Sequence, residues 1–84
     1  MPARQVTVYS LPACVQCTAT YRALDKHEID YVVVDLADDA NAGAREWIGE
    51  ELGYSRAPVV VVDDDLHWAG YRPDRIAALR AAVA

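Results

Sequence analysis

The stretch Cys14-Val15-Gln16-Cys17 holds the only two cysteines of this 84-residue chain, and it decides how the rest is interpreted. A disulfide between residues three positions apart closes a loop too small to constrain much of the chain. Such a spacing suits a bond that opens and closes. In a protein without an export signal, a Cys-x-x-Cys that follows a strand and begins a helix is typical of a redox-active pair.

The residues around this motif supply that strand and helix. The β-branched and aromatic run from Gln5 to Ser10 predicts a strand, and the good helix formers from Val15 to about His27 predict a helix. Further along, the patterns predict strands at 31–36, 58–62 and 66–69, a helix from Asp38 or Asp39 to about Leu52, and a final helix from Pro73. The order is therefore βαβαββα.

This order predicts an α/β thioredoxin fold, with a four-stranded mixed sheet and helices on both faces. The whole chain, 1–84, is expected to form one such domain. The continuous apolar run from Tyr31 to Leu36 favours a strand that is buried on both faces. The two last strands follow each other closely, so an antiparallel hairpin is expected.

Composition excludes several kinds of partner. The chain has 13 acidic and 8 basic residues, a formal net charge of -5, and its basic residues form no stripe. Nucleic-acid binding is therefore not expected. No apolar run approaches the roughly 18–20 residues of a membrane span, and residues 1–5 lack the apolar core of a signal peptide. We expect a cytoplasmic protein, and a monomer, since a carrier must dock with two partners in turn.

The two cysteines are predicted to have different roles. Unpaired N–H groups and partial positive charge at a helix N-terminus favour a thiolate at Cys14. Cys17 lies one turn on and on the same face, so it can resolve a mixed disulfide formed by Cys14. Val15 and Gln16 are neutral and tune the potential of the pair. The redox-active disulfide Cys14–Cys17 needs no bound cofactor.

Plainer interpretations stay open at these positions. The cysteines could be buried and inert, or could bind zinc with His27 and His67, although these histidines lack metal-ligand spacing. Pro58 could be an ordinary strand-start proline, or it could follow a cis bond from Ala57 beside the cysteines.

Two segments together carry a resemblance to a known family: the Cys14–Cys17 motif and Trp68-Ala69-Gly70-Tyr71-Arg72-Pro73-Asp74. In this order and at this distance, they resemble the NrdH-redoxins, glutaredoxin-like proteins that behave like thioredoxins. The shorter stretches Leu52-Gly53-Tyr54 and Ala57-Pro58-Val59-Val60 also match.

The resemblance implies a protein disulfide oxidoreductase that donates electrons to the large subunit of class Ib ribonucleotide reductase, in deoxyribonucleotide synthesis. A thioredoxin reductase that uses NADPH would re-reduce it. Pro58 looks like the family's cis-proline, with the backbone of Ala57 pairing with a partner chain. Trp68, Gly70 and Tyr71 match a segment that shapes an apolar partner surface, although core packing is the competing interpretation for Trp68 and Tyr71.

Five residues depart from the family pattern, and one of them is Ser10, where threonine is common. Ala69 stands where serine is usual, and Leu11 stands where a basic residue is common, which discourages a glutathione substrate. Arg56 replaces a common glutamine and places a positive charge near the partner or the thiolate. Glu28 replaces a common glycine and would be strained in a left-handed cap, so the first helix is expected to end differently.

Three alternative functions remain from the sequence. A glutaredoxin or mycoredoxin using a low-molecular-weight thiol is disfavoured, because such proteins typically carry proline or tyrosine between the cysteines. A metal or iron–sulfur binding module and a redox-inert interaction domain are the other two.

Overall fold

The fold follows the predicted order of elements. The computed structural model describes residues 5–83, and the side chains of residues 5–79. The elements are β1 (Val6–Ser10), α1 (Val15–Lys26), β2 (Tyr31–Asp35), η1 (Asp39–Asn41), α2 (Ala42–Glu46), η2 (Trp47–Glu51), β3 (Val59–Val61), β4 (His67–Ala69) and α3 (Pro73–Val83). No helix in this described part is long and apolar enough to cross a membrane.

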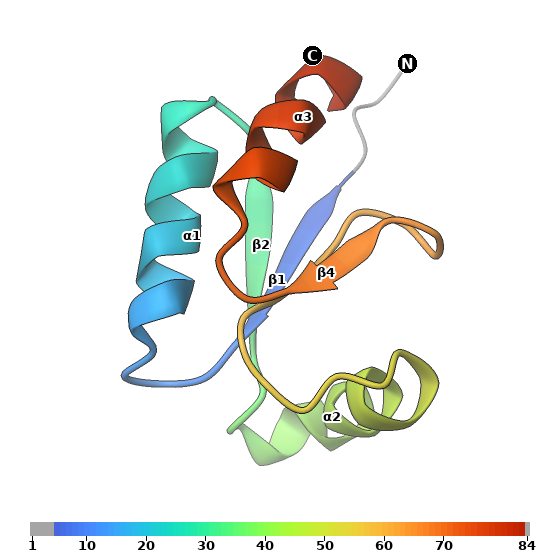
Figure 1. The fold of residues 1–84 in the computed structure, drawn as a ribbon. Coiled ribbons are helices and arrows are strands. Elements are labelled where there is room, and N and C mark those ends of the chain that lie inside the picture. Colours follow the sequence, from blue (N-terminus) through green and yellow to red (C-terminus); the bar gives the residue numbers. More distant parts are fainter. Residues whose placement is uncertain (1–4, 84) are drawn as a thin grey trace.

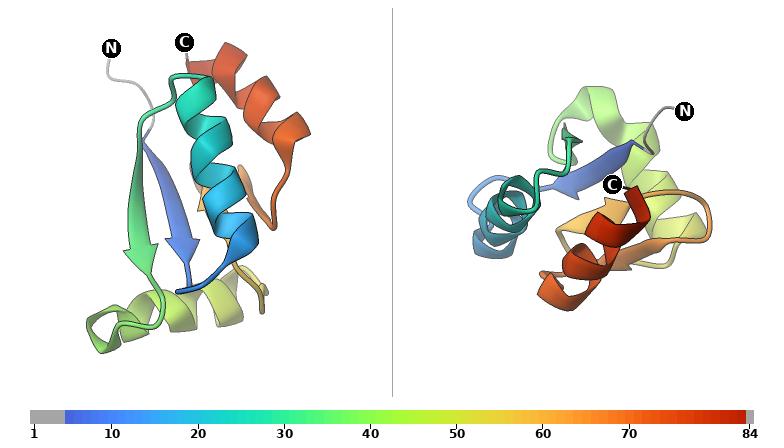
Figure 2. Two further views of the ribbon diagram at one scale, coloured as in Figure 1. Left: turned by 90° about the vertical axis from the view of Figure 1, so that its left-hand side faces the viewer. Right: turned by 90° about the horizontal axis from the view of Figure 1, so that it is seen from above.

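The four strands form one mixed sheet in the order β2-β1-β3-β4. Strand β1 runs parallel to β2 and antiparallel to β3, with Val8 opposite Val33 on one side and Val60 on the other. The β3–β4 pair is antiparallel, as expected for a hairpin. Helices α1 and α3 lie side by side over one face, and α2 lies on the other side (Figures 1 and 2). The predicted thioredoxin fold is confirmed.

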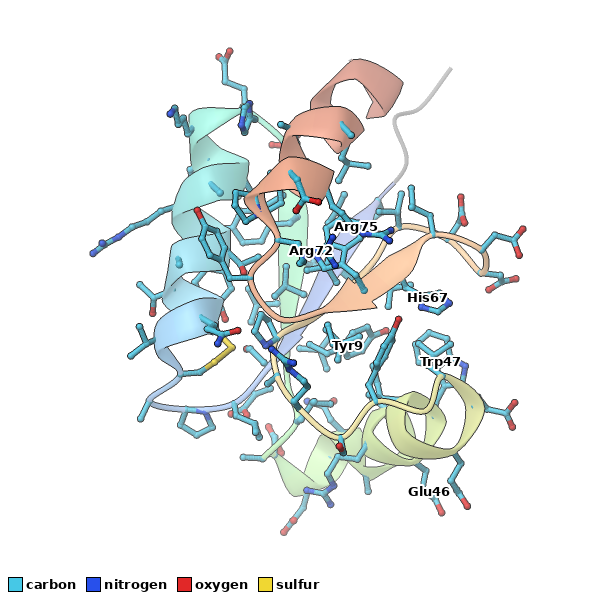
Figure 3. The ribbon with its side chains drawn as sticks, in the orientation of Figure 1. Tyr9, Glu46, Trp47, His67, Arg72 and Arg75 are labelled. Carbon is cyan, nitrogen blue, oxygen red and sulfur yellow. A yellow bond between two sulfur atoms is a disulfide. The ribbon has the colours of Figure 1, made fainter. Side chains whose placement is uncertain are left out.

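The main core lies between the sheet and the α1–α3 layer. Alternate residues of β1 point into it, because side chains along a strand alternate between faces. The buried cluster comprises Val6, Val8, Leu24, Ile29, Val60, Val62, Trp68, Ile76 and Leu79. On the other face, the Tyr9 ring packs 5.9 Å from the Trp47 ring, centroid to centroid (Figure 3). Packing on both faces fixes the end of β1, from which the chain runs into the cysteine motif.

The prediction that the second strand is buried on both faces is wrong. β2 is an edge strand, and the side chains of Val32 and Val33 are 42% and 49% exposed. An apolar run alone does not reveal whether a strand has neighbours on both sides. The observed strand also ends one residue earlier than predicted, at Asp35 rather than Leu36.

The second helical region is confirmed in extent but not in regularity. Asp38 caps it, since its Oδ1 accepts the Ala40 N–H at 3.0 Å, and Gly53 follows it with a left-handed φ of 77°. Between these ends, one 3₁₀ turn, a short α-helix and a π-helical turn replace the continuous helix that was expected. The Leu52 N–H reaches the Trp47 carbonyl, five residues back, at 3.2 Å.

The end of α1 contradicts the expectation at Glu28. This residue adopts the left-handed conformation itself, with φ 57°. Its N–H donates to the Asp25 carbonyl at 3.0 Å, and the Ile29 N–H donates to the Leu24 carbonyl at 2.9 Å, which is a Schellman motif. Ile29 and Leu24 are both buried. The gain from these two hydrogen bonds and this apolar burial outweighs the local strain at Glu28.

Glu28→Gly is therefore expected to stabilise the protein. A non-glycine residue in the left-handed region costs about 1 kcal/mol, and glycine removes that strain, although it also makes the unfolded chain more flexible. We expect a net rise in Tm of a few degrees, about 4–8 °C for each kcal/mol gained. Thermal unfolding followed by circular dichroism measures it. Glu28→Ala, which keeps a Cβ, serves as the control and should not raise Tm; a glycine variant that melts lower than the parent would contradict the prediction.

Candidate active site

The two cysteines lie at the N-terminal end of α1 and form a disulfide. Cys14 is the N-cap residue, and Cys17 lies in the first helical turn, with 5.2 Å between the two Cα atoms. Figure 3 shows the yellow sulfur–sulfur bond at this end of the helix. In the structure, the pair therefore lies at a strand-to-helix junction, as the sequence predicted.

Backbone groups of the helix are directed at Cys14. The Cys17 N–H donates to Cys14 Sγ at 3.1 Å, and the Thr18 N–H donates to the Cys14 carbonyl at 3.2 Å. The sulfur thus occupies the position in which a serine or aspartate oxygen usually caps a helix. A thiolate formed there after reduction would accept the same N–H and face the positive end of the helix dipole.

The two sulfur-bearing residues differ in exposure. The side chain of Cys17 is buried, at 2% exposed, whereas Cys14 is only partly buried. Cys14 opens onto a shallow cleft of about 520 Å³ whose other lining residues are Leu11, Ala13, Val15, Cys17, Thr18 and Tyr21. A large disulfide substrate can therefore reach Cys14 and not Cys17, which supports the predicted division into attacking and resolving thiols.

The bond between Ala57 and Pro58 is cis in the structure. Pro58 is buried directly before β3, and its carbonyl accepts the Gly70 N–H at 2.7 Å. This hydrogen bond joins the proline segment to the segment that follows β4. The pairing of the Ala57 backbone with a partner chain stays a prediction.

Gly70 is the point at which three segments meet beside the disulfide. It has φ 85°, and a Cβ added to it would lie 2.6 Å from Arg56 Nη2 and 3.3 Å from Gln16 Oε1. The neighbouring Tyr71 N–H donates to Gln16 Oε1 at 3.1 Å. Gln16, one of the two residues between the cysteines, thus ties the redox motif to the loop after β4, and the left-handed φ at position 70 favours glycine.

The other residues of this loop divide between core and surface. Trp68 is 3% exposed and packs in the core, with the Arg75 guanidinium carbon 5.9 Å from its ring centroid, whereas Tyr71 is 39% exposed. Because the Trp68 ring is buried, Tyr71 is the aromatic side chain of this segment that is exposed to a partner. The core-packing interpretation therefore fits Trp68, and the surface interpretation fits Tyr71.

Arg72 and Asp74 hold the start of α3. The Arg72 Nε and Nη2 groups donate to Asp74 Oδ1 and Oδ2 at 3.1 and 2.9 Å. This double hydrogen bond lowers the pKa of Asp74 and raises that of Arg72. Both side chains are exposed, so the pair orients the turn and contributes little to stability.

Tyr21 is a site residue that the sequence interpretation missed. It lines the disulfide cleft, and its hydroxyl donates to Ser10 Oγ at 2.8 Å. Its ring stacks on Tyr31, with centroids 5.7 Å apart and planes 2° from parallel. The available signal was its spacing, four residues after Cys17, which places both on one face of the helix.

The histidines considered as zinc ligands lie elsewhere. The ring of His67 approaches the Tyr54 hydroxyl, with 2.9 Å between Nδ1 and the oxygen, and His27 ends α1. Within the described side chains, no three histidine, cysteine or acidic residues converge as a metal site would need.

A thioredoxin fold with an accessible Cys-x-x-Cys at a helix N-terminus defines a thiol–disulfide oxidoreductase. The glutaredoxin family model matches residues 6–68 of this chain. The glutaredoxin-like protein NrdH of Escherichia coli K12 is 36% identical over 93% of this chain and 91% of its own length, and that of Salmonella typhimurium is 41% identical over 84% and 83%. The chain belongs to the glutaredoxin family and, within it, to the NrdH-redoxins.

Solved structures agree with this assignment. The structure of NrdH-redoxin from Escherichia coli, whose title reports a thioredoxin-like activity profile, has a TM-score of 0.75 and 33% identity over 89% of this chain and 93% of its own. A glutaredoxin from Archaeoglobus fulgidus has a TM-score of 0.76 at 26% identity, over 92% of this chain and 85% of its own.

Proposed function

We propose that this protein reduces the disulfide that class Ib ribonucleotide reductase accumulates on its large subunit, and that an NADPH-dependent thioredoxin reductase restores the dithiol. The observation that supports the proposal is a hydrogen bond between two segments. Gln16 of the cysteine motif accepts it from the backbone N–H of Tyr71, in the loop after β4. These are the two segments on which the resemblance to the NrdH-redoxins rests in the sequence. The proposal places the reaction in the cytoplasm, where thiols are kept reduced.

The geometry supports a two-step exchange. The Cys14 thiolate attacks one sulfur of the partner disulfide, which forms a mixed disulfide and releases one partner thiol. Cys17, held one turn away in the same helix, then attacks Cys14 Sγ and releases the second partner thiol. Two electrons and two protons pass to the partner, and the Cys14–Cys17 disulfide is left. No bound cofactor takes part.

The lining of the cleft weighs against a small charged thiol as the reductant. Leu11 and Val15 are apolar and exposed, and no cation is among the described residues that line the disulfide cleft. A glutathione or mycothiol carboxylate would find no cationic partner among the residues of this cleft itself, whereas a protein surface can cover its apolar rim. This feature favours protein partners over the low-molecular-weight-thiol alternative.

Reconstitution tests the proposal. A class Ib reductase with its small subunit, thioredoxin reductase and NADPH should form deoxyribonucleotide through many turnovers only when this protein is added. Glutathione with glutathione reductase should not replace the thioredoxin reductase. Cys14→Ser protein is the matched control and should support no turnover. Equal rates with and without this protein would refute the proposed function, and reduction only by the small thiol would favour the alternative.

A further inference from the structure

A second groove adjoins the disulfide cleft. It has a volume of about 190 Å³ and lies between the α2 region and the segment before Pro58. Its described lining is Leu11, Leu36, Arg45, Ile48, Tyr54, Ser55 and Arg56. Leu11 also lines the disulfide cleft, so the two depressions are neighbours across this one side chain. A chain that crosses Cys14 can continue over Leu11 into the groove.

The groove is positive on an acidic protein. Arg45 and Arg56 line it, and none of its described lining residues is acidic, although the chain carries 13 acidic against 8 basic residues. Neither guanidinium forms an ion pair with a carboxylate in the described side chains. A local excess of positive charge in a concave, partly apolar site attracts a carboxylate and raises the rate of encounter with it.

The two guanidinium groups lie in different surroundings, and neither pairs with a carboxylate among the described side chains. Arg45 Nη1 donates to the Leu36 carbonyl at 2.9 Å. Arg56 lies against the backbone of Gly70, close enough that Nη2 would be 2.6 Å from a Cβ at that position. Each guanidinium has five N–H donors, so both retain donors for an incoming group. Because the Arg45 guanidinium is already hydrogen-bonded to the Leu36 carbonyl, binding a carboxylate there loses less conformational entropy.

We propose that this groove binds an acidic side chain of the partner protein, placed a few residues from the disulfide that Cys14 attacks. The inference deepens the proposed function, on which it rests, by naming a feature of the partner segment. Arg56 and Arg45 act in recognition and take no part in the exchange of sulfur bonds.

Two synthetic peptides test the proposal without any reductase. Both peptides carry the same internal disulfide. In one peptide, the two residues before the disulfide and the two residues after it are glutamates. In the other peptide, the same four positions are glutamines. Protein reduced beforehand is mixed with each peptide in a single turnover. The protein dithiol becomes the disulfide, and the peptide disulfide becomes the dithiol, so the reaction is balanced. We expect the glutamate peptide to react about fivefold to tenfold faster at low salt, with the preference falling as salt rises.

Variants of the two groove arginines test whether the preference for the glutamate peptide depends on the groove. Arg56→Gln and the double variant with Arg45→Gln should bring the ratio of the two rates towards one, whereas Arg56→Lys, which keeps the charge, should retain most of it. Arg22→Gln removes an equal charge from the exposed surface of α1 and should leave the ratio unchanged. Circular dichroism checks that each variant is folded.

Equal rates for the two peptides with the unmodified protein would overturn the inference. A preference that survives in the double variant would overturn it too, since the charge would then act from elsewhere. The proposed function fails in a different assay, the reconstitution with ribonucleotide reductase, so the two failures are distinguishable.

Discussion

Cys14→Ser should reduce the rate of protein disulfide reduction to below about a thousandth of that of the parent, because a serine hydroxyl cannot act as the attacking thiolate. Cys17→Ser should behave differently. Its Cys14 thiolate can still attack, but nothing resolves the product, so a covalent adduct with the partner accumulates. Turnover with insulin as a disulfide substrate measures the loss, and mass spectrometry without reductant measures the adduct.

The unequal outcome follows from the unequal exposure of the two residues, with Cys17 only 2% exposed. The variant with both residues changed to serine is the control, and it should form no adduct. If Cys14→Ser trapped the partner and Cys17→Ser did not, the roles of the two thiols would be reversed. Adducts in both single variants would show that burial does not protect Cys17.

The elements of the fold were predictable because local patterns specify them. The strand-to-helix junction at the cysteines, the Asp38 cap and Gly53 after the second helix all have signals within a few residues. The exposure of Val32 and Val33 had no such signal, since it depends on the order of strands in the sheet. At Glu28 the local rule favoured another ending, and the buried Leu24–Ile29 pair decided against it.

The candidate site also has some features that the sequence alone predicts and others that depend on the folded chain. The cysteine pair is visible in the sequence, because its chemistry and its position at the helix start are local. The hydrogen bond from Tyr71 to Gln16 joins residues 55 positions apart, and the packing of Arg56 on Gly70 joins two loops. Only the folded chain brings these groups together, so the sequence could predict a positive charge from Arg56 near the partner or the thiolate, but not its packing against Gly70.

Trp68→Ala should cost about 3–5 kcal/mol of unfolding free energy, a large part of the roughly 5–15 kcal/mol of a typical domain. The ring is 3% exposed within the main core, so its removal leaves a cavity. Trp68→Phe should cost less, because it keeps most of the apolar contact and the Nε1 group has no hydrogen-bond partner among the described residues. Urea unfolding followed by circular dichroism measures both losses without any partner present.

Tyr71→Ala is the matched change on the surface side of the same loop. Its side chain is 39% exposed, so we expect a loss of less than about 1 kcal/mol. Its backbone N–H, which binds Gln16, is retained. An exposed aromatic beside the redox pair is suited to anchor a partner, so the rate of reduction by thioredoxin reductase should fall about tenfold. A stable Trp68→Ala protein with slow partner reduction would instead place Trp68 in the partner surface, because a core residue cannot be removed without a loss of stability.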